Sequence, residues 1–342
     1  MMPAATPSLM RALELRSYGA GPKNLEVVQR PVPQPGPGQV LVRIAASPIN
    51  PSDLAFMSGV YGVLKPLPVV PGIEASGTVV AAGRGLYPRF LVGKRVACAA
   101  GEGDGAWAEY MVTRAMQCMP LPGTVSLEQG AMSIVNPLTA WALMEIARKE
   151  RHRGVVQTAA ASALGKMILR LGLRRRTPVI HIVRRPAQVE LLRALGAGAD
   201  VVLDSSEPDF EERLRAAARR WHATIAFDAV AGAMTGRIVQ ALPKRSKVIV
   251  YGGLSPEACH VDARQFIFEH KRVQGFWLSQ PAPLSTIDLL RGIAAVRSGL
   301  AADFQSEVRL RLPLEAATQG LEQYAAQMTE GKVLLMPQTG AV

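Results

Sequence analysis

The sequence is poor in cysteine and in long apolar segments. Its three cysteines, Cys98, Cys118 and Cys259, are odd in number and far apart in the chain, which argues against a disulfide framework or a CxxC metal cluster. No apolar run is long enough to cross a bilayer, and the opening residues MMPAATPSLMRALEL lack the layout of a signal peptide. We therefore expect a cytoplasmic protein without a membrane partner.

Acidic residues are too few to balance the basic ones. The chain has 27 Asp and Glu residues against 39 Lys and Arg residues, a net charge of +12 at pH 7. This surplus fits an anionic cofactor, an acidic partner, nucleic acid or an arginine-rich proteome. The basic residues are scattered, apart from the runs 174–176 and 184–185, and no aromatic residues are interleaved with them. We therefore do not expect dedicated nucleic-acid binding.

Two patterns of apolar residues divide the chain. At 342 residues it is long enough for two domains. From about residue 10 to 123, short β-type runs are separated by Pro and Gly, which predicts a compact, mostly antiparallel β domain. These runs are VLVRIAA, GTVVAAG, KRVACAA and WAEYMV.

From about Ser126, apolar strands alternate with helical segments. The strands read VVQT, VIHIV, DVVLD, TIAFDAV, KVIVYGG and RVQGFW. Strict alternation predicts a parallel, doubly wound sheet, and six strands complete a dinucleotide-binding domain. The last β run does not extend this alternation and is expected to return to the first domain. We predict a first domain over 1–125, completed by 279–342, a second over 126–278, and an active site in the cleft between them.

The turn after the first of these strands, VVQTAAASALG, has one glycine where a phosphate-binding loop has three. Only Gly165 remains, at the position of the third glycine, which allows the helix to pack closely against the strand. Alanine and serine still leave room, and the N–H groups at a helix start attract an anion. The candidate contacts to a pyrophosphate are Ala161, Ser162, Ala163 and Leu164. Ser162 can instead cap the helix, and an ordinary strand–turn–helix without a ligand remains an alternative.

The end of the second strand indicates which dinucleotide is used. An NAD enzyme carries Asp or Glu there for the ribose hydroxyls, but VIHIV runs into Arg184, Arg185 and Pro186. Two guanidinium groups suit a 2′-phosphate, which favours NADPH. The alternative is a pair of surface arginines on a basic protein.

Two further segments follow strands at the edge where such sheets bind ligands. Tyr251, Gly252 and Gly253 end the fifth strand, and the glycines allow close approach of a cofactor. The segment 276–278, Phe-Trp-Leu, follows the sixth strand and either lines the cofactor and substrate pocket or forms interdomain core. None of the five histidines lies in a motif, so we interpret them as structural.

Several segments together resemble one superfamily. They are INPSD at 49–53, SGVYG at 58–62, VNPLTA at 135–140, the AxxSxxG turn at 159–165, VRRP at 183–186, YGGL at 251–254 and FIF with GFWLSQ at 266–280. The chain resembles the medium-chain dehydrogenase/reductase superfamily, and within it the zinc-free, NADPH-dependent 2-enoyl thioester reductases of the mitochondrial type and the quinone oxidoreductases. This resemblance implies an α/β protein with a GroES-like, mostly β catalytic domain and a Rossmann domain.

The ligands of the superfamily's zinc are missing. Zinc alcohol dehydrogenases have Gly-His-Glu where this chain has Gly72, Ile73 and Glu74, and a cysteine before the equivalent of Asp53. Neither that cysteine nor the four-cysteine structural zinc lobe is present. A catalytic zinc needs three protein ligands, so we predict no metal site.

The resemblance also implies a reaction. Hydride passes from nicotinamide C4 to the β-carbon of an enoyl thioester, and a proton is added at the α-carbon. Tyr61 occupies the position of the catalytic tyrosine, whose phenol can donate to an enolate, although a tyrosine packed at the domain interface is the alternative. Asn50, Asn136 and Thr139 are expected near the cofactor by resemblance alone. Lys332 either reaches the cofactor phosphates or is a surface lysine.

We therefore predict NADPH-dependent reduction of an activated C=C bond, with 2-enoyl thioesters of CoA or acyl carrier protein as the expected substrates. The alternative is an NADPH:quinone oxidoreductase or an alkenal reductase. A phosphate site at the cleft mouth would separate them, and Lys65 and Arg89 are the nearby cations. A third hypothesis is a non-catalytic cofactor-binding protein that acts through its basic surface. The family suggests a homodimer.

Overall fold

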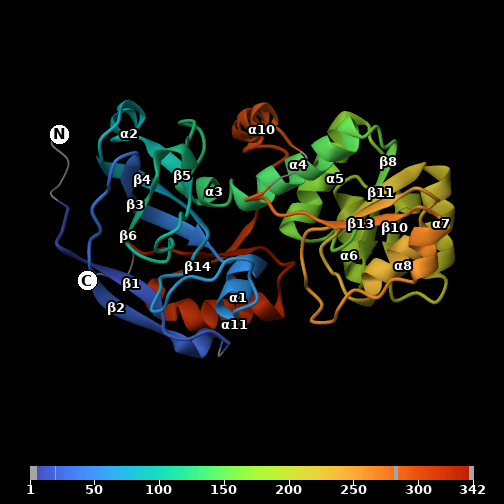
Figure 1. Ribbon diagram of the computed structural model, residues 1–342, viewed down its shortest axis with the longest axis horizontal. Coiled ribbons are helices and arrows are strands. Elements are labelled where there is room, and N and C mark those ends of the chain that lie inside the picture. Colours follow the sequence, from blue (N-terminus) through green and yellow to red (C-terminus); the bar gives the residue numbers. More distant parts are fainter. Residues whose placement is uncertain (1–5, 20, 281–283, 339–342) are drawn as a thin grey trace. The chain divides into compact units, whose positions relative to one another are not determined.

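The chain folds into two compact units, one formed by Met1–Val135 with Val296–Val342 and the other by Asn136–Ala295. The computed structural model describes residues 6–19, 21–280 and 284–338. Figure 1 shows the first unit in blue, green and red, and the second in green, yellow and orange.

The first unit is built on a seven-stranded sheet of order β14-β15-β3-β4-β5-β7, with β6 paired to β3. Its strands are β3 (Gln39–Pro48), β4 (Glu74–Ala82), β5 (Arg95–Ala99), β6 (Tyr110–Arg114), β7 (Cys118–Pro120), β14 (Val308–Leu312) and β15 (Lys332–Leu335). All pairs are antiparallel except β14 with β15. The predicted antiparallel domain is therefore confirmed, and so is the return of the C-terminal tail, because Leu335 pairs with Ser47.

Strand β3 is buried on both faces because its apolar residues alternate between two cores. Val40, Val42 and Ile44 belong to one cluster, and Leu41 belongs to the other. The second cluster also receives the hairpin of β1 (Leu9–Leu15) and β2 (Leu25–Pro31). The helices of this unit are α1 (Pro51–Met57), α2 (Leu86–Leu91), α3 (Leu127–Ala131) and α11 (Ala317–Ala326).

Two of the cysteines lie opposite each other in the sheet. Cys98 and Cys118 are far apart in the chain, but they face each other directly on the paired strands β5 and β7. Both are free and buried, and burial raises the pKa of the Cys118 thiol to about 12. They are distant in the chain, and the antiparallel pairing of β5 with β7 brings them together.

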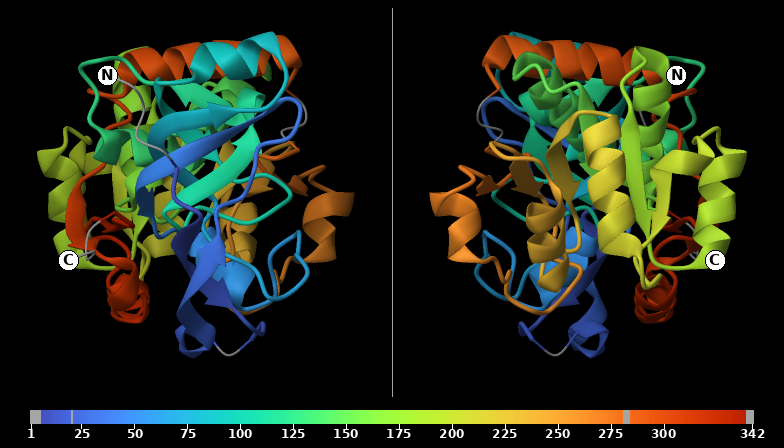
Figure 2. Two further views of the ribbon diagram at one scale, coloured as in Figure 1. Left: turned by 90° about the vertical axis from the view of Figure 1, so that its left-hand side faces the viewer. Right: turned by 90° about the vertical axis from the view of Figure 1, so that its right-hand side faces the viewer.

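The second unit is a six-stranded parallel sheet of order β10-β9-β8-β11-β12-β13. This is the order of a complete doubly wound dinucleotide-binding sheet, as predicted. Its strands are β8 (Gly154–Gln157), β9 (Val179–Val183), β10 (Val202–Asp204), β11 (Ala223–Asp228), β12 (Lys247–Val250) and β13 (Arg272–Gly275). The helices are α4 (Val135–Lys149), α5 (Ala163–Arg175), α6 (Pro186–Ala194), α7 (Phe210–Arg220), α8 (Ala233–Ala241), α9 (Ala263–Ile267) and α10 (Thr286–Gly299). The first residue of α4 and the segment 296–299 of α10 belong to the first unit. The views of Figure 2 show the helices beside the strands.

Two hydrophobic clusters cover the sheet. One joins Phe210 and Leu214 of α7 with Ile238 of α8, and the other joins Leu169 of α5 with Leu192 of α6. The predicted apolar stripe of α5 is buried along its length, at residues 164, 167, 168 and 171. Helix α6 begins at Pro186 and ends before Gly196, as the sequence predicts.

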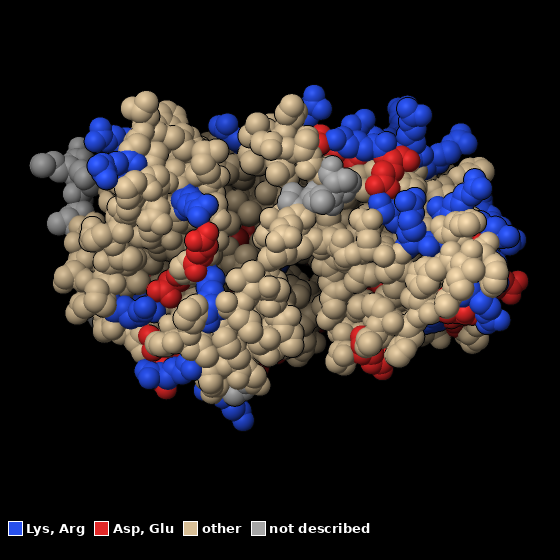
Figure 3. All heavy atoms as spheres, in the orientation of Figure 1, with Lys and Arg blue, Asp and Glu red and all other residues tan. Residues whose placement is uncertain are grey.

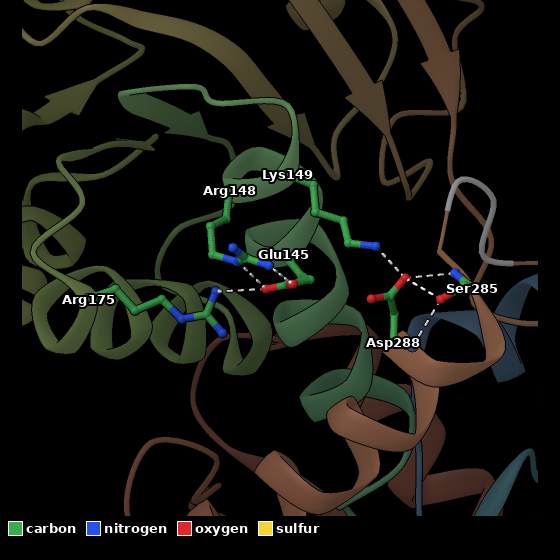
Figure 4. A network of polar contacts seen from close by, with 6 residues as sticks. All are labelled: Glu145, Arg148, Lys149, Arg175, Ser285 and Asp288. Carbon is green, nitrogen blue, oxygen red and sulfur yellow. Dashed lines mark hydrogen bonds and ion pairs between the residues drawn. The ribbon is translucent and has the colours of Figure 1, made fainter.

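Polar contacts tie α4 to its neighbours within the second unit (Figure 4). Glu145 on α4 binds Arg148 and lies 4.0 Å from the guanidinium of Arg175 on α5. Lys149 binds Asp288 in the first turn of α10, and Asp288 also accepts from the Ser285 N–H at 2.8 Å. The Lys149 ammonium and the Ser285 donors lower the pKa of Asp288. These contacts fix the C-terminal end of α4 between α5 and α10.

Candidate functional site

The turn between β8 and α5 keeps the backbone of a phosphate loop without its first glycines. Ala159 adopts a positive φ of 47°, a conformation that is usual for glycine and costly for other residues. Gly165 is required, because a Cβ there would lie 2.4 Å from the Ala160 carbonyl oxygen. The surviving glycine is therefore at the position where the helix contacts its own turn.

Ser162 caps α5. Its Oγ accepts a hydrogen bond from the Gly165 N–H at 3.1 Å, so the capping alternative of the sequence analysis is confirmed. Ala161 is buried, whereas Ser162 and Ala163 are half-buried. The N–H groups of Ala163 and Leu164 are in the first helical turn, where no intrahelical acceptor exists. This end of α5 can accept an anion.

Arg184 and Arg185 follow β9 directly, and both are exposed. Arg185 is the N-cap residue of α6, and the Arg184 N–H donates to Gln188 Oε1 at 3.2 Å. Among the contacts between described residues, neither guanidinium has a protein partner. Both charges can therefore reach a ligand phosphate at the carboxyl end of the sheet.

The residues after β12 lie at the same edge of the sheet. The Tyr251 hydroxyl is buried and has no hydrogen-bond partner among the described residues, and its burial raises its pKa. A Cβ on Gly252 would lie 2.9 Å from the Ala229 oxygen, whereas Gly253 faces open space. After β13, Phe276 is buried, and Trp277 and Leu278 are half-buried.

Tyr61 lies in the first unit, in the loop between α1 and β4. It is half-buried and packs against the hydrophobic cluster that contains Phe56 and Trp107. Gly59, two residues before it, has a φ of 77° that favours glycine. Close by in sequence, the Lys65 ammonium donates to the Gly101 oxygen at 2.9 Å, while Arg89 is exposed on α2.

A fully buried polar cluster lies in the first unit, formed by Asn50, Asp53, Glu74 and Lys332. Asn50 Nδ2 donates to Glu74 Oε1 at 3.0 Å, and Lys332 Nζ donates to Asn50 Oδ1. Asp53 accepts from the N–H groups of Asn50 at 2.8 Å and Ile73 at 3.1 Å. Lys332 is therefore a buried lysine, which excludes the alternative of a surface lysine, while its contact with the cofactor phosphates stays a prediction. Asn50 is enclosed within the cluster.

Burial governs the charges in this cluster. Loss of solvent raises the pKa of Asp53 to about 7, and the negative charge of Glu74 contributes. Burial also raises the pKa of Glu74 and lowers that of Lys332, while the attraction between these opposite charges works against both shifts. Lys332 is the positive group that offsets both buried carboxyl groups, whereas the two carboxyl groups disfavour each other's charge.

The other carboxylate oxygen of Glu74 reaches the start of α4. Glu74 Oε2 accepts from the N–H groups of Ile134 at 3.0 Å and Val135 at 2.9 Å. Asn136, the next residue, is half-buried, and Thr139 is buried one turn further along. Sequence reasoning missed this role of Glu74. The only signal was an acidic residue at the start of an otherwise uncharged strand.

A metal site has no support in the described residues. No group of three or more His, Cys, Asp or Glu side chains among them could hold a metal ion. His181, which is buried in β9, lies 2.7 Å from Gln157 Nε2, and its pKa is lowered by burial to about 4. Within the same residues, no helix has the length and apolar character of a membrane span.

Two family models match the chain. Residues 36–123 match the alcohol dehydrogenase GroES-like domain, and residues 163–292 match the model described as zinc-binding dehydrogenase. The mitochondrial enoyl-[acyl-carrier-protein] reductase of Bos taurus is 29% identical over 92% of this chain and 87% of that protein.

Solved structures cover nearly the whole chain. A proposed NADPH:quinone reductase from Mesorhizobium loti has 39% identity and a TM-score of 0.89, over 97% of this chain and 100% of that one. A mycobacterial protein solved with NADPH has 27% identity and a TM-score of 0.81, over 96% of this chain and 100% of that one.

Proposed function

This chain belongs to the medium-chain dehydrogenase/reductase superfamily and is an NADPH-dependent oxidoreductase, and from this premise we propose that it reduces the activated C=C bond of 2-enoyl thioesters. The main support for this substrate class is the similarity to the Bos taurus enoyl reductase along 92% of the chain. The GroES-like unit also contains Tyr61, to which the family resemblance assigns the role of proton donor.

The second unit would hold the cofactor. The N–H groups at 161–164 suit the pyrophosphate, and Arg184 and Arg185 suit the 2′-phosphate. The buried Tyr251 hydroxyl supports this assignment because, among the residues that the structure describes, it has no partner at the carboxyl edge of the sheet. Gly252, Gly253 and the segment 276–278 are further proposed cofactor contacts, and the family resemblance adds Asn136 and Thr139 of α4. Bound NADPH supplies the hydride.

The first unit would supply the proton. Reduction places negative charge on the thioester oxygen, which a hydrogen-bond donor stabilises in a site that excludes water. We assign the proton delivered to the α-carbon to the Tyr61 phenol, which is neutral at pH 7. Its half-buried position against the Phe56 cluster holds the ring while leaving part of it accessible.

We propose a homodimer formed through β13. This strand is at the edge of the six-stranded sheet, and an edge strand presents free backbone groups that can pair with another chain. Three exposed apolar residues precede it, Phe266, Ile267 and Phe268. A second copy of the chain would cover both the edge and these side chains.

A steady-state panel with NADPH tests the substrate class. Crotonyl-CoA, longer enoyl-CoAs, an enoyl-acyl carrier protein, a simple quinone and an alkenal are compared by kcat/KM. We expect the enoyl thioesters to be preferred over the quinone by about 100-fold or more, because a site that pairs with the thioester's polar groups rejects compounds that lack them. The CoA and carrier-protein arms separate the two thioester donors.

The second candidate is NADPH:quinone oxidoreductase activity. It is favoured by the Mesorhizobium loti structure, described as a proposed NADPH:quinone reductase, at 39% identity. A higher kcat/KM for the quinone than for every enoyl thioester would select this alternative and reject the first.

A further inference from the structure

Both oxygens of the Glu74 carboxylate are engaged inside the first unit. Oε1 accepts from Asn50 Nδ2 at 3.0 Å, and Oε2 accepts from two consecutive backbone N–H groups, those of Ile134 and Val135. The side chain is fully buried, so water does not compete for these bonds. A buried carboxylate that accepts several hydrogen bonds has a fixed orientation.

The two backbone donors mark the start of α4. N–H groups at the beginning of a helix have no partner within it, and a negative charge there is favoured by the helix dipole. Glu74 supplies both the acceptor and the charge from a different strand. Asn136 follows immediately, and Thr139 is one turn further along α4.

The remaining members of the cluster hold Glu74 in place. Asn50 turns its Nδ2 toward Glu74 because its Oδ1 accepts from Lys332. The backbone of Asn50 is fixed in turn by Asp53 Oδ2 at 2.8 Å. Glu74 therefore cannot turn away from α4 without leaving the Asn50 amide and the two backbone N–H groups without their acceptor.

We propose that Glu74 is a positioning residue for cofactor binding, which fixes the start of α4 and thereby places Asn136 and Thr139 against NADPH. This inference rests on the proposed role of those two residues as cofactor contacts. It gives a function to a carboxylate that the reaction itself does not use.

Two charge-balanced double variants test it. Glu74→Gln with Lys332→Met removes both charges but keeps an oxygen that can accept from the α4 N–H groups. In the same variant Asn50 is free to turn its amide and pair with the new carboxamide. Glu74→Met with Lys332→Met removes the charges and also the acceptor. The pair therefore differs in the contact to α4, while the change of buried charge is the same.

The first measurement is the Kd for NADPH by fluorescence titration. We expect the Gln double variant to stay within about 3-fold of the wild type and the Met double variant to bind roughly 10-fold or more weakly, because contacts to a ligand fail when their support shifts. Thermal unfolding of both variants shows whether they are folded. Equal Kd values for two folded double variants would overturn the proposal.

Hydrogen exchange on the wild-type protein keeps the proposal testable if a variant does not fold. The amides of Ile134 and Val135 should exchange slowly without ligand, and NADPH should slow exchange across 136–139. Rapid exchange at Ile134 and Val135, or no effect of NADPH on 136–139, would contradict it. Neither measurement uses an acceptor substrate, so failure to reduce enoyl thioesters would reject the proposed function and leave this test intact.

Discussion

Arg184 and Arg185 are the side chains on which the cofactor preference depends. They are exposed at the end of β9, where an NAD enzyme has an acidic residue. Replacing both with Ala should raise the Kd for NADPH by about 10-fold or more and leave the Kd for NADH nearly unchanged. The reason is that only NADPH has a 2′-phosphate that the two guanidinium groups can bind.

The matched control is Arg151→Ala with Arg153→Ala, which removes the same charge from the opposite end of the sheet, before β8. Both double variants are compared with the wild type by titration with the two dinucleotides. Equal weakening of NADPH and NADH by the 184/185 variant would show that these arginines do not contact the 2′-phosphate.

Tyr61 is the residue on which the proposed chemistry depends. Tyr61→Phe keeps the ring packed against its cluster and removes only the hydroxyl, so stability should change little. If the phenol delivers the proton, kcat for an enoyl thioester should fall by roughly 100-fold, in the range typical of a general acid. Tyr87→Phe on α2 is the control, and it should keep wild-type kcat. A Tyr61→Phe enzyme with unchanged kcat would remove this residue from the mechanism.

The β8–α5 turn leads to a prediction about the stability of a single element. Gly165→Ala would place a Cβ 2.4 Å from a backbone oxygen, so the helix must move away from the turn. We expect a loss of about 1 to 3 kcal/mol in the free energy of unfolding, as for other overpacked sites.

Gly103→Ala is the control for this substitution, because no heavy atom lies within 4 Å of a Cβ built there. Urea unfolding of the two variants measures the difference. If Gly165→Ala were as stable as Gly103→Ala, the turn would be able to relax, and the contact with Ala160 would not explain the surviving glycine.

Elements were predictable from sequence where a local pattern determines them. The run VIHIV is β9 to the residue, and the spacing of Leu164, Met167, Ile168 and Leu171 predicted the buried face of α5. The cluster around Glu74 was not predictable in this way. Asn50, Glu74 and Lys332 come from three segments, and only the pairing of β15 with β3 brings Lys332 to the other two.

The site was less predictable than the fold, because several of its residues are brought together only by strand pairing. The position of Ser162 at a helix start indicated a cap as one of its two possible roles, because capping is a local interaction. The burial of Lys332 and the opposition of Cys98 to Cys118 depend on which strands pair, and no local signal in the sequence carries that information.

At the scale of the whole molecule, the basic surplus gathers on the second unit. Figure 3 shows Lys and Arg side chains concentrated over the region of α4 and α5 on this face. The last turns of α4 and α5 contain Arg148 and Lys149, and Arg174 and Arg175. Positive side chains at a helix C-terminus are favoured by the helix dipole, so part of this charge stabilises the unit itself.

The proposed homodimer is tested by its mass in solution. The chain has a mass of 36.6 kDa, and light scattering after size exclusion should give twice that value. Ile267→Lys with Phe268→Lys should yield a monomer, because charges would then face each other across the β13 edge. Leu86→Lys, a substitution of an exposed apolar residue on α2, is the control and should remain dimeric. A dimer that survives the 267/268 substitutions would place the interface elsewhere.

The central claim is that the protein delivers hydride to one carbon and a proton to its neighbour. The most direct test is reduction of crotonyl-CoA with NADPH that has deuterium in the transferred position at nicotinamide C4, analysed by NMR of the product. The account predicts one deuterium at the β-carbon of the butyryl-CoA and none at the α-carbon. In heavy water with unlabelled NADPH, the deuterium should instead appear at the α-carbon. Absence of the reduced thioester, or deuterium from NADPH at the α-carbon, would contradict it.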